Sequence, residues 1–124
     1  MKIKFKIEIA FAITLTVLLL ALCVNKFFTL KTQALQGLND RNYSLLNDAL
    51  GVYRGDNEGL CPDVLEDLVP FYIEKIPPVY NGKGKELIKV KNTKEATSFD
   101  KETAWIYVND KTSEDYCRVF INKR

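Results

Sequence analysis

Two cysteines in the polar part of the chain could form a covalent link. Cys61 and Cys117 follow a long apolar run, whereas a third cysteine, Cys23, lies inside it. If the polar part is exported, oxidising conditions allow Cys61 and Cys117 to pair. On the chain-entropy estimate the closed loop is worth about 4 kcal/mol, which would help a domain of this size. The alternative is that both are buried free thiols.

A single carboxylate, Glu8, stands at the start of the apolar run. Charge at this position is costly unless it is paired or remains near a membrane interface. One interpretation is a carboxylate at headgroup depth, neutralised by Lys4 or Lys6. The other is a functional role, which depends on what the rest of the chain is.

The sequence does not indicate catalysis. It contains no histidine, the commonest general base and metal ligand. Ser44, Ser98 and Ser113 therefore have no histidine to activate them. The stretch NGKGKE, residues 81–86, lacks the strand–loop–helix setting and the Gly-Lys-Ser/Thr ending of a phosphate-binding loop. We expect a loop there, and neither an enzyme nor a cofactor.

Two acidic turns could offer oxygen ligands to calcium, and they hold Asp56 and Glu58 in one and Asp110, Glu114 and Asp115 in the other. Neither turn has the spacing of a twelve-residue calcium loop. We therefore expect solvated turns and predict no metal site. The net charge is +2 and the lysines are scattered, so a nucleic-acid partner is not expected.

The apolar run, residues 9–24, allows three interpretations. A cleaved secretory signal fits the basic start, but no A-x-A-like cleavage pattern follows the run. A lipoprotein leader would use Cys23, but Leu22 before it is too bulky for the usual pattern. A retained membrane span fits best, because residues 7–24 would cover roughly 27 Å as a helix. The lysines at the start favour an N-in, C-out orientation.

A second helical pattern follows the run without interruption by proline. Between residues 27 and 53 the apolar side chains recur mostly at steps of three and four, as in an amphipathic helix. Span and stripe together predict one helix of about 45 to 50 residues. We divide the chain into a membrane-spanning or filament-core segment (1–28), an amphipathic continuation (29–54) and a small globular head (55–124).

The head is predicted to combine a short helix with a small sheet. The helix would begin at Pro62 or Asp63 and bury Val64, Leu65, Leu68 and Val69. Three strands are expected at residues 86–91, 103–110 and 115–123, from their alternating apolar and polar side chains. The predicted fold class is α+β, with the long helix packed on a three-stranded antiparallel sheet.

This layout resembles the type IV pilin-like proteins, especially the small pseudopilins of type II secretion-like systems. The resemblance covers most of the chain. It includes the basic start, the glutamate at the mouth of an apolar helix, and the amphipathic continuation. Three stretches are similar to family motifs, namely LLNDALGVYRGDNEGLCP at the helix end, LEDLVPFYIEKIPP after it, and the closing AWIYVNDKTSEDYCRVFIN.

The resemblance implies a structural subunit of a filament, with apolar helices in the filament core and heads outside. Glu8 would set the register by pairing with the amino terminus of a neighbouring subunit. The partners would be other pilin-like subunits, an inner-membrane assembly platform and the membrane. The head would be extracytoplasmic, periplasmic or at the cell surface, on a single-pass anchor. Core side chains would come from Tyr53, Leu65, Leu68, Trp105, Tyr107 and Phe120, and Cys61–Cys117 would tie the helix end to the last strand.

The processing site departs from the family pattern. Family precursors have glycine or alanine before the cleavage point, then phenylalanine or methionine, with glutamate fifth in the mature chain. Counting back from Glu8 makes Lys4 the first residue and Ile3 the one before it, and counting from Phe5 makes Glu8 fourth. Cleavage, and the amino-terminal methylation that depends on it, are therefore in question. This departure supports the alternative function, a membrane-anchored extracytoplasmic binding module that stays monomeric.

Overall fold

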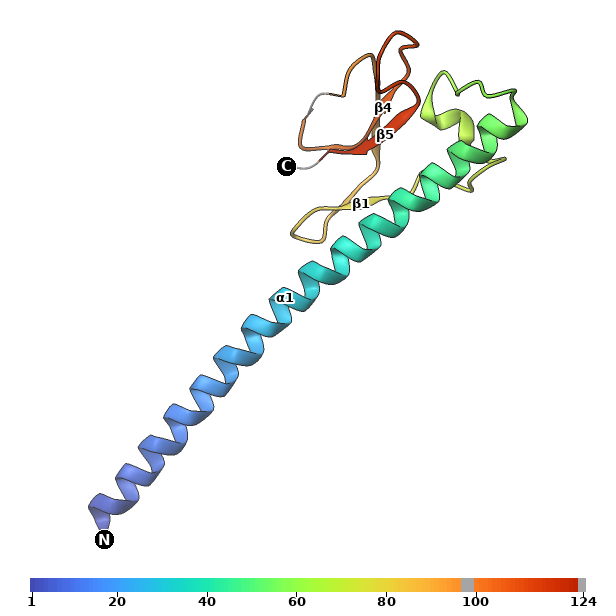
Figure 1. Cartoon of the computed structure of the whole chain (residues 1–124). Helices are drawn as coiled ribbons and strands as arrows, with labels where there is room; N and C mark the ends of the chain where they lie inside the picture. Colours follow the sequence, from blue (N-terminus) through green and yellow to red (C-terminus); the bar gives the residue numbers. More distant parts are fainter. Residues whose placement is uncertain (97–99, 123–124) are drawn as a thin grey trace. The chain divides into compact units, whose positions relative to one another are not determined.

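The computed structural model describes residues 1–96 and 100–122. It combines one long helix with short strands, which confirms the predicted α+β class (Figure 1). In chain order the elements are helix α1 (Lys2–Asp56), the 3₁₀ helix η1 (Leu65–Leu68), and strands β1 (Val79–Tyr80), β2 (Glu86–Leu87), β3 (Lys89–Thr93), β4 (Thr103–Val108) and β5 (Arg118–Ile121). The chain divides into two compact units, Met1–Ala34 and Leu35–Arg124.

Helix α1 extends through the apolar run and the amphipathic stretch, as predicted, and is 55 residues long. No proline interrupts it, and its interior glycines stand at positions where nothing crowds the backbone. It ends where the sequence turns to glycine, asparagine and aspartate. There the backbone turns left-handed at Glu58 (φ 55°) and Gly59 (φ 84°). The Gly59 amide donates to the Arg54 carbonyl at 2.8 Å, which closes the last turn of the helix.

The core of the unit Leu35–Arg124 lies between the second part of α1 and the sheet. Leu46, Ala49 and Leu50 are the buried residues of the helix, at the three- and four-residue spacing of one face. The other buried members of this core are Leu65, Leu68, Ile73, Val79, Ala104, Trp105, Tyr107, Cys117 and Val119. Of the core residues that the resemblance implied, four are fully buried, whereas Tyr53 and Phe120 are only partly buried.

The main sheet has the strand order β3-β4-β5, and the relative direction of two of its strands differs from the prediction. β4 and β5 are antiparallel, as expected, with Ile106 opposite Phe120. β3 and β4 are parallel, with Val90 opposite Trp105. The prediction that the whole sheet is antiparallel was therefore wrong. Alternation of side chains indicates which face a residue occupies, but it says nothing about strand direction.

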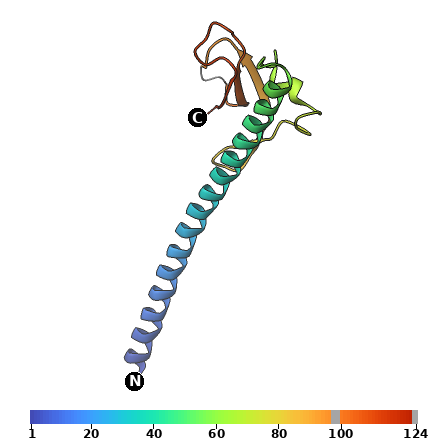
Figure 2. The ribbon, with the colours of Figure 1, turned by 45° about the vertical axis from the view of Figure 1, so that its right-hand side comes forward.

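The predicted strand at residues 86–91 is two strands. Glu86–Leu87 (β2) pairs antiparallel with β1, and Lys89–Thr93 (β3) pairs with β4. Ile88 lies between them and is 66% exposed. Both views show the β1 hairpin beside the adjoining part of α1 (Figures 1 and 2). The chain therefore leaves one sheet and enters another within a single apolar–polar pattern.

The short helix after the turn is also smaller than predicted. Only Leu65–Leu68 is helical, as one 3₁₀ turn, and these two leucines are fully buried. Val64 is extended, with φ −133° and ψ 149°, and 37% exposed. Val69 precedes Pro70, and a residue before proline is pushed out of the helical region, so the turn ends at Leu68.

Candidate functional site

The unit Met1–Ala34 presents an apolar surface that none of the described residues covers. All its residues are exposed, including Phe11 at 70% and Leu20 at 60%. By length and composition α1 is also the one helix among the described residues that could cross a membrane, and none of its most apolar stretch is buried. This segment is therefore a candidate single membrane span. A secretory signal sequence can have the same length and composition.

The polar side chains within this segment bond to their own helix. The hydroxyls of Thr14 and Thr16 donate to the carbonyls of Ala10 and Ala12, at 2.9 and 2.8 Å. Thr29 repeats the pattern four residues back, to Asn25. A hydroxyl in hydrocarbon is costly unless it has a partner. These threonines therefore add little polarity to the surface of the apolar segment.

Glu8 is exposed on α1, near the N-terminal end of the apolar segment. Within the described chain neither Lys4 nor Lys6 forms an ion pair with it, because the ion pairs there are Lys89–Asp100 and Arg118–Asp115. Lys4 and Phe5, the two possible first residues of a processed chain, are helical and exposed. The intramolecular contacts of the chain thus leave the Glu8 carboxylate available to an external partner.

The predicted disulfide is present in the head. Cys61, in the turn after α1, is bonded to Cys117, directly before β5, across a sequence separation of 56. Cys117 has a positive φ of 65°, and its amide donates to the Val108 carbonyl at 2.9 Å. The bond therefore fixes the end of the helix against the end of the sheet. The remaining cysteine, Cys23, is free and exposed.

Hydrogen bonds attach the segment after Cys61 to the sheet. The buried Tyr107 hydroxyl donates to the Pro62 carbonyl at 2.7 Å, and the Asn109 amide donates to the Asp63 carbonyl at 2.8 Å. The Leu65 amide donates to the Asn92 side chain at 3.1 Å. Burial, the largest cause, raises the pKa of the Tyr107 hydroxyl, which therefore stays a neutral donor. The disulfide therefore lies next to a group of hydrogen bonds that join residues 62–65 to the sheet.

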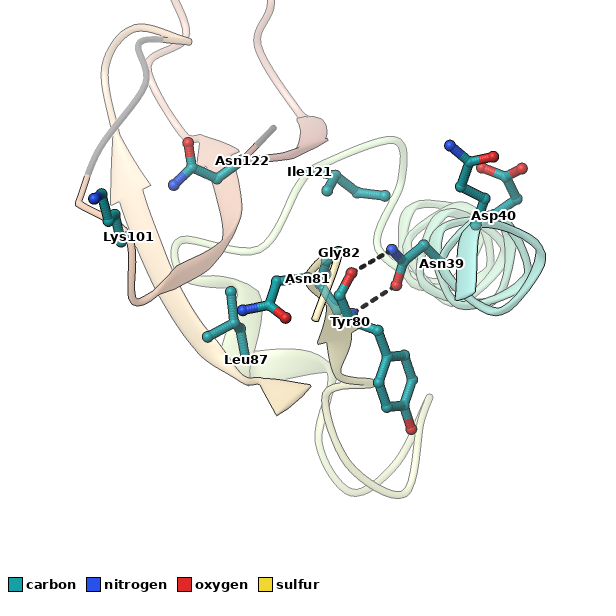
Figure 3. Close-up of a pocket in the computed structure, with 11 residues that line it drawn as sticks. Asn39, Asp40, Tyr80, Asn81, Gly82, Leu87, Lys101, Ile121 and Asn122 are labelled. Atoms are coloured by element: carbon teal, nitrogen blue, oxygen red, sulfur yellow. Dashed lines mark hydrogen bonds between the residues drawn. The ribbon is translucent and has the colours of Figure 1, made fainter. Parts of the chain in front are cut away.

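A cavity of about 720 Å³ opens between α1, the β1–β2 hairpin and the end of β5 (Figure 3). Its lining mixes apolar side chains with four amide side chains, one acidic residue and one basic residue. The lining residues are Gln36, Asn39, Asp40, Val79, Tyr80, Asn81, Gly82, Leu87, Lys101, Ile121 and Asn122. The buried Asn122 Oδ1 accepts no hydrogen bond from any described residue, whereas the Asn122 amide donates to the carbonyls of Asp100 and Thr103.

Two asparagines of α1 bind the backbone of residues 78–80, and one of them, Asn39, lines this cavity. Asn39 donates to the Tyr80 carbonyl at 2.8 Å and accepts from the Tyr80 amide at 2.7 Å, as one strand does with another (Figure 3). Asn42 donates to the Pro78 carbonyl at 2.7 Å. The sequence-based prediction missed both residues. The sequence did contain a signal for them. At helical periodicity both asparagines fall on the same face as Leu46, and a polar residue on a face that packs into the core needs a hydrogen-bond partner.

The other candidate sites are structural turns. Residues 81–85 form the loop of the β1–β2 hairpin and Glu86 begins β2; in this loop Asn81 Oδ1 accepts from the amides of Lys83 and Lys85. Asp110 accepts from the Thr112 amide and hydroxyl, and these bonds lower the pKa of its carboxyl group. In the described part of the chain no three metal-binding side chains come together. Ser98 lies outside the described residues.

Comparisons with models of known protein families, with curated proteins and with solved structures found no match to this chain. Two features stand out among the described residues. One is an uncovered apolar helix segment with a carboxylate at its start, and the other is a disulfide-bonded head with a cavity.

Proposed function

We propose that this chain is a structural subunit of a filament of the type IV pilus or type II secretion kind, anchored and assembled through the first part of α1. One observation carries the proposal. The unit Met1–Ala34 has no buried residue, whereas the unit Leu35–Arg124 holds a closed core and a disulfide. Exposed apolar area of this extent is stable only against lipid or against other apolar helices. The proposed subunit passes from the first of these environments to the second.

Glu8 is the residue that distinguishes a filament subunit from a simple anchor. A carboxylate that rests among headgroups beside lysines is exposed, and an exposed ion pair is worth about 0 to 1 kcal/mol. A carboxylate paired inside a water-poor bundle of helices is different, because removing one partner leaves the other charge buried at a cost of roughly 3 to 5 kcal/mol. On this proposal Glu8 pairs with a cationic group of a neighbouring copy and sets the register of the bundle.

The test is Glu8→Gln in the full chain, expressed with its assembly machinery. Cys23 is free and exposed in the apolar segment, so a bifunctional thiol reagent can report contact between neighbouring helices. We expect Glu8→Gln to leave membrane extraction and the Cys61–Cys117 disulfide unchanged but to reduce crosslinking strongly. Asp40→Asn is the matched control, because it removes a carboxylate from the same helix within the head. Normal crosslinking of the Glu8→Gln chain would reject the register role.

A second function is favoured by the cavity of the head. A cavity of about 720 Å³ whose lining includes four amide side chains suits a small ligand that carries hydroxyl or amide groups. On this alternative the chain is a monomeric extracytoplasmic binding module on a membrane anchor. Absence of Cys23 crosslinks in the unmodified chain, together with saturable ligand binding that Asn81→Leu abolishes, would favour this function over the filament.

A further inference from the structure

The loop of the β1–β2 hairpin contains the one asparagine of this sequence that precedes a glycine, Asn81 before Gly82. Such a pair can react without an enzyme. The backbone nitrogen of the second residue attacks the side-chain carbonyl carbon of the asparagine, and a glycine permits this approach because it has no β-carbon in the way. Whether the reaction is promoted depends on how the loop holds the reacting atoms.

The side chain of Asn81 is held with its carbonyl oxygen polarised. The backbone amides of Lys83 and Lys85 donate to Asn81 Oδ1 at 3.0 and 2.9 Å. Attack on the side-chain carbon places negative charge on this oxygen, and two backbone donors at such distances stabilise the charge as it develops. Among the described residues no group binds Asn81 Nδ2, which is the leaving group of the reaction.

The nucleophile, the backbone nitrogen of Gly82, belongs to an exposed and uncrowded residue. Apart from its two chain neighbours, no described atom lies within 4 Å of the place where a β-carbon of Gly82 would stand. The hydrogen bonds that close the loop use other amides, because Asn81 donates to the Lys85 carbonyl at 3.1 Å and Gly84 donates to the Asn81 carbonyl at 2.8 Å. The Gly82 nitrogen is therefore available to react.

We propose that Asn81 deamidates in the folded head and that the hairpin loop promotes the reaction. Hydroxide removes the proton from Gly82 N, which forms a bond to Asn81 Cγ. The bond from Cγ to Nδ2 then breaks, and Nδ2 takes a proton from water and leaves as ammonia. Water opens the resulting five-membered imide at one of its two carbonyl carbons, giving aspartate or isoaspartate at position 81. No oxidant or reductant is required, because carbon keeps its oxidation level throughout.

The two products have different consequences for the loop. An aspartate keeps both acceptor bonds from the amides of Lys83 and Lys85, and these bonds become stronger because the acceptor is charged. An isoaspartate adds one atom to the main chain at position 81, so the backbone bonds that join this residue to Gly84 and Lys85 lose their spacing. We therefore expect the aspartate form to keep the hairpin and the isoaspartate form to open it.

The reaction also changes the cavity of about 720 Å³, because Asn81 is one of its lining residues (Figure 3). The unmodified lining contains one acidic side chain, Asp40, and one basic side chain, Lys101. Deamidation adds a second acidic group, so the charge of the lining changes from balanced to negative. A cationic ligand is then favoured over an anionic one. This one-way change of charge requires neither of the two functions proposed above.

The test is to incubate the full chain at mildly acidic and at mildly alkaline pH and to map its peptides. Cleavage after lysine releases residues 76–83 as one peptide. Its mass increases when the amide NH₂ is replaced by OH, and chromatography separates the aspartate form from the isoaspartate form. A sample digested without incubation corrects for reaction during digestion. We expect Asn81 to be the most rapidly converted asparagine, at a rate that rises in proportion to hydroxide.

A synthetic peptide of residues 76–83, incubated alone, shows what the fold contributes. We expect the folded chain to convert at a rate equal to or greater than that of the peptide, because only the folded loop places two amides on Asn81 Oδ1. A lower rate in the folded chain than in the peptide would mean that the fold protects Asn81, and it would overturn the proposal.

Gly82→Ala tests which nitrogen attacks. A methyl group at this position obstructs the approach, so conversion of Asn81 should fall to the level of the other asparagines, although the space around Gly82 accommodates the methyl group. Gly51→Ala, at another uncrowded glycine, is the matched control and should leave the rate unchanged. Equal rates in Gly82→Ala and the unmodified chain would refute attack by Gly82 N. Formation of the Cys61–Cys117 disulfide confirms in each variant that the head is folded.

Discussion

Leucines on the same helix have opposite environments in the two units of this chain. Leu20 in the unit Met1–Ala34 is 60% exposed, whereas Leu46 in the unit Leu35–Arg124 is 0% exposed. Both belong to α1, and both residues have the same preference for helix. The difference arises from what the rest of the chain supplies. Distant segments cover Leu46, while Leu20 has only its own helix.

Polar side chains show the same contrast. Thr14 and Thr16 bond to carbonyls four residues back on their own helix. Asn39 and Asn42 bond instead to the backbone of residues 78–80, about forty positions further along the sequence. One unit satisfies its polar groups locally and leaves its apolar surface for other molecules. In the unit Leu35–Arg124, both polar and apolar side chains of the helix contact distant segments of the same unit.

The largest expected effect concerns the covalent link, which only the head has. Cys61→Ser/Cys117→Ser should lower the free energy of unfolding of the head by about 4 kcal/mol, because the reduced chain gains loop entropy when it unfolds. Cys23→Ser should leave it unchanged. Chemical denaturation followed by the fluorescence of Trp105, the single tryptophan and fully buried, measures both. Equal stability of the two variants would show that the disulfide is not a structural link.

The second effect tests the comparison between the leucines directly. Leu46→Ala should destabilise the head by about 3 kcal/mol, from lost burial and the cavity that remains. Leu20→Ala, the same change on the same helix, should leave head unfolding unaffected. The same denaturation experiment applies. A comparable loss for Leu20→Ala would mean that the two units are energetically coupled.

The third effect tests the polar contrast. Asn39→Ala should cost about 2 kcal/mol, because the Tyr80 backbone loses its donor and its acceptor together. Asn47→Ala is the control, since the Asn47 amide donates only to the Tyr43 carbonyl of its own helix. We expect at most a small change there in thermal unfolding. If Asn47→Ala is as damaging as Asn39→Ala, helix propensity rather than the long-range bond explains both.

The smallest effect concerns acid stability. Lys89, with further hydrogen bonds from Thr103, lowers the pKa of Asp100 from 3.8 to about 2. Because the Asp100 carboxyl has a lower pKa in the folded head than in the unfolded chain, its ionised form stabilises the folded head above about pH 4. This stabilisation is lost as the pH falls from about 4 to about 2. The thermal midpoint of Asp100→Asn should therefore fall less than that of the unmodified head across this interval. Both side chains are exposed, so the difference should be modest, and it should shrink further in a Lys89→Gln background.

Local patterns in the sequence were sufficient for the helix, the turn after it and the disulfide. α1 was visible because three- and four-residue steps continue without proline, and its end because Gly55 and Gly59 flank turn-forming residues. These features depend on neighbours in sequence or, for the disulfide, on there being only two cysteines outside the apolar run.

What escaped prediction depends on contacts between distant residues. The parallel direction of β3 against β4 is not recorded by side-chain alternation. The break at Ile88 and the Asn39–Tyr80 bonds likewise require the partner segment to be in place. The role of Glu8 is harder still to predict from one sequence, because its proposed partner belongs to another copy of the chain.

The disulfide also determines how this chain would respond to mechanical tension. A force that pulls α1 away from β5 passes through the turn at residues 57–61, crosses the Cys61–Cys117 bond and continues into β5. Residues 62–116, which include β1 to β4, lie outside this covalent path. They are shielded from the load even if β5 is stripped from β4. Under tension the extensible length of the head is therefore short, and most of its sheet can remain folded until the bond is reduced.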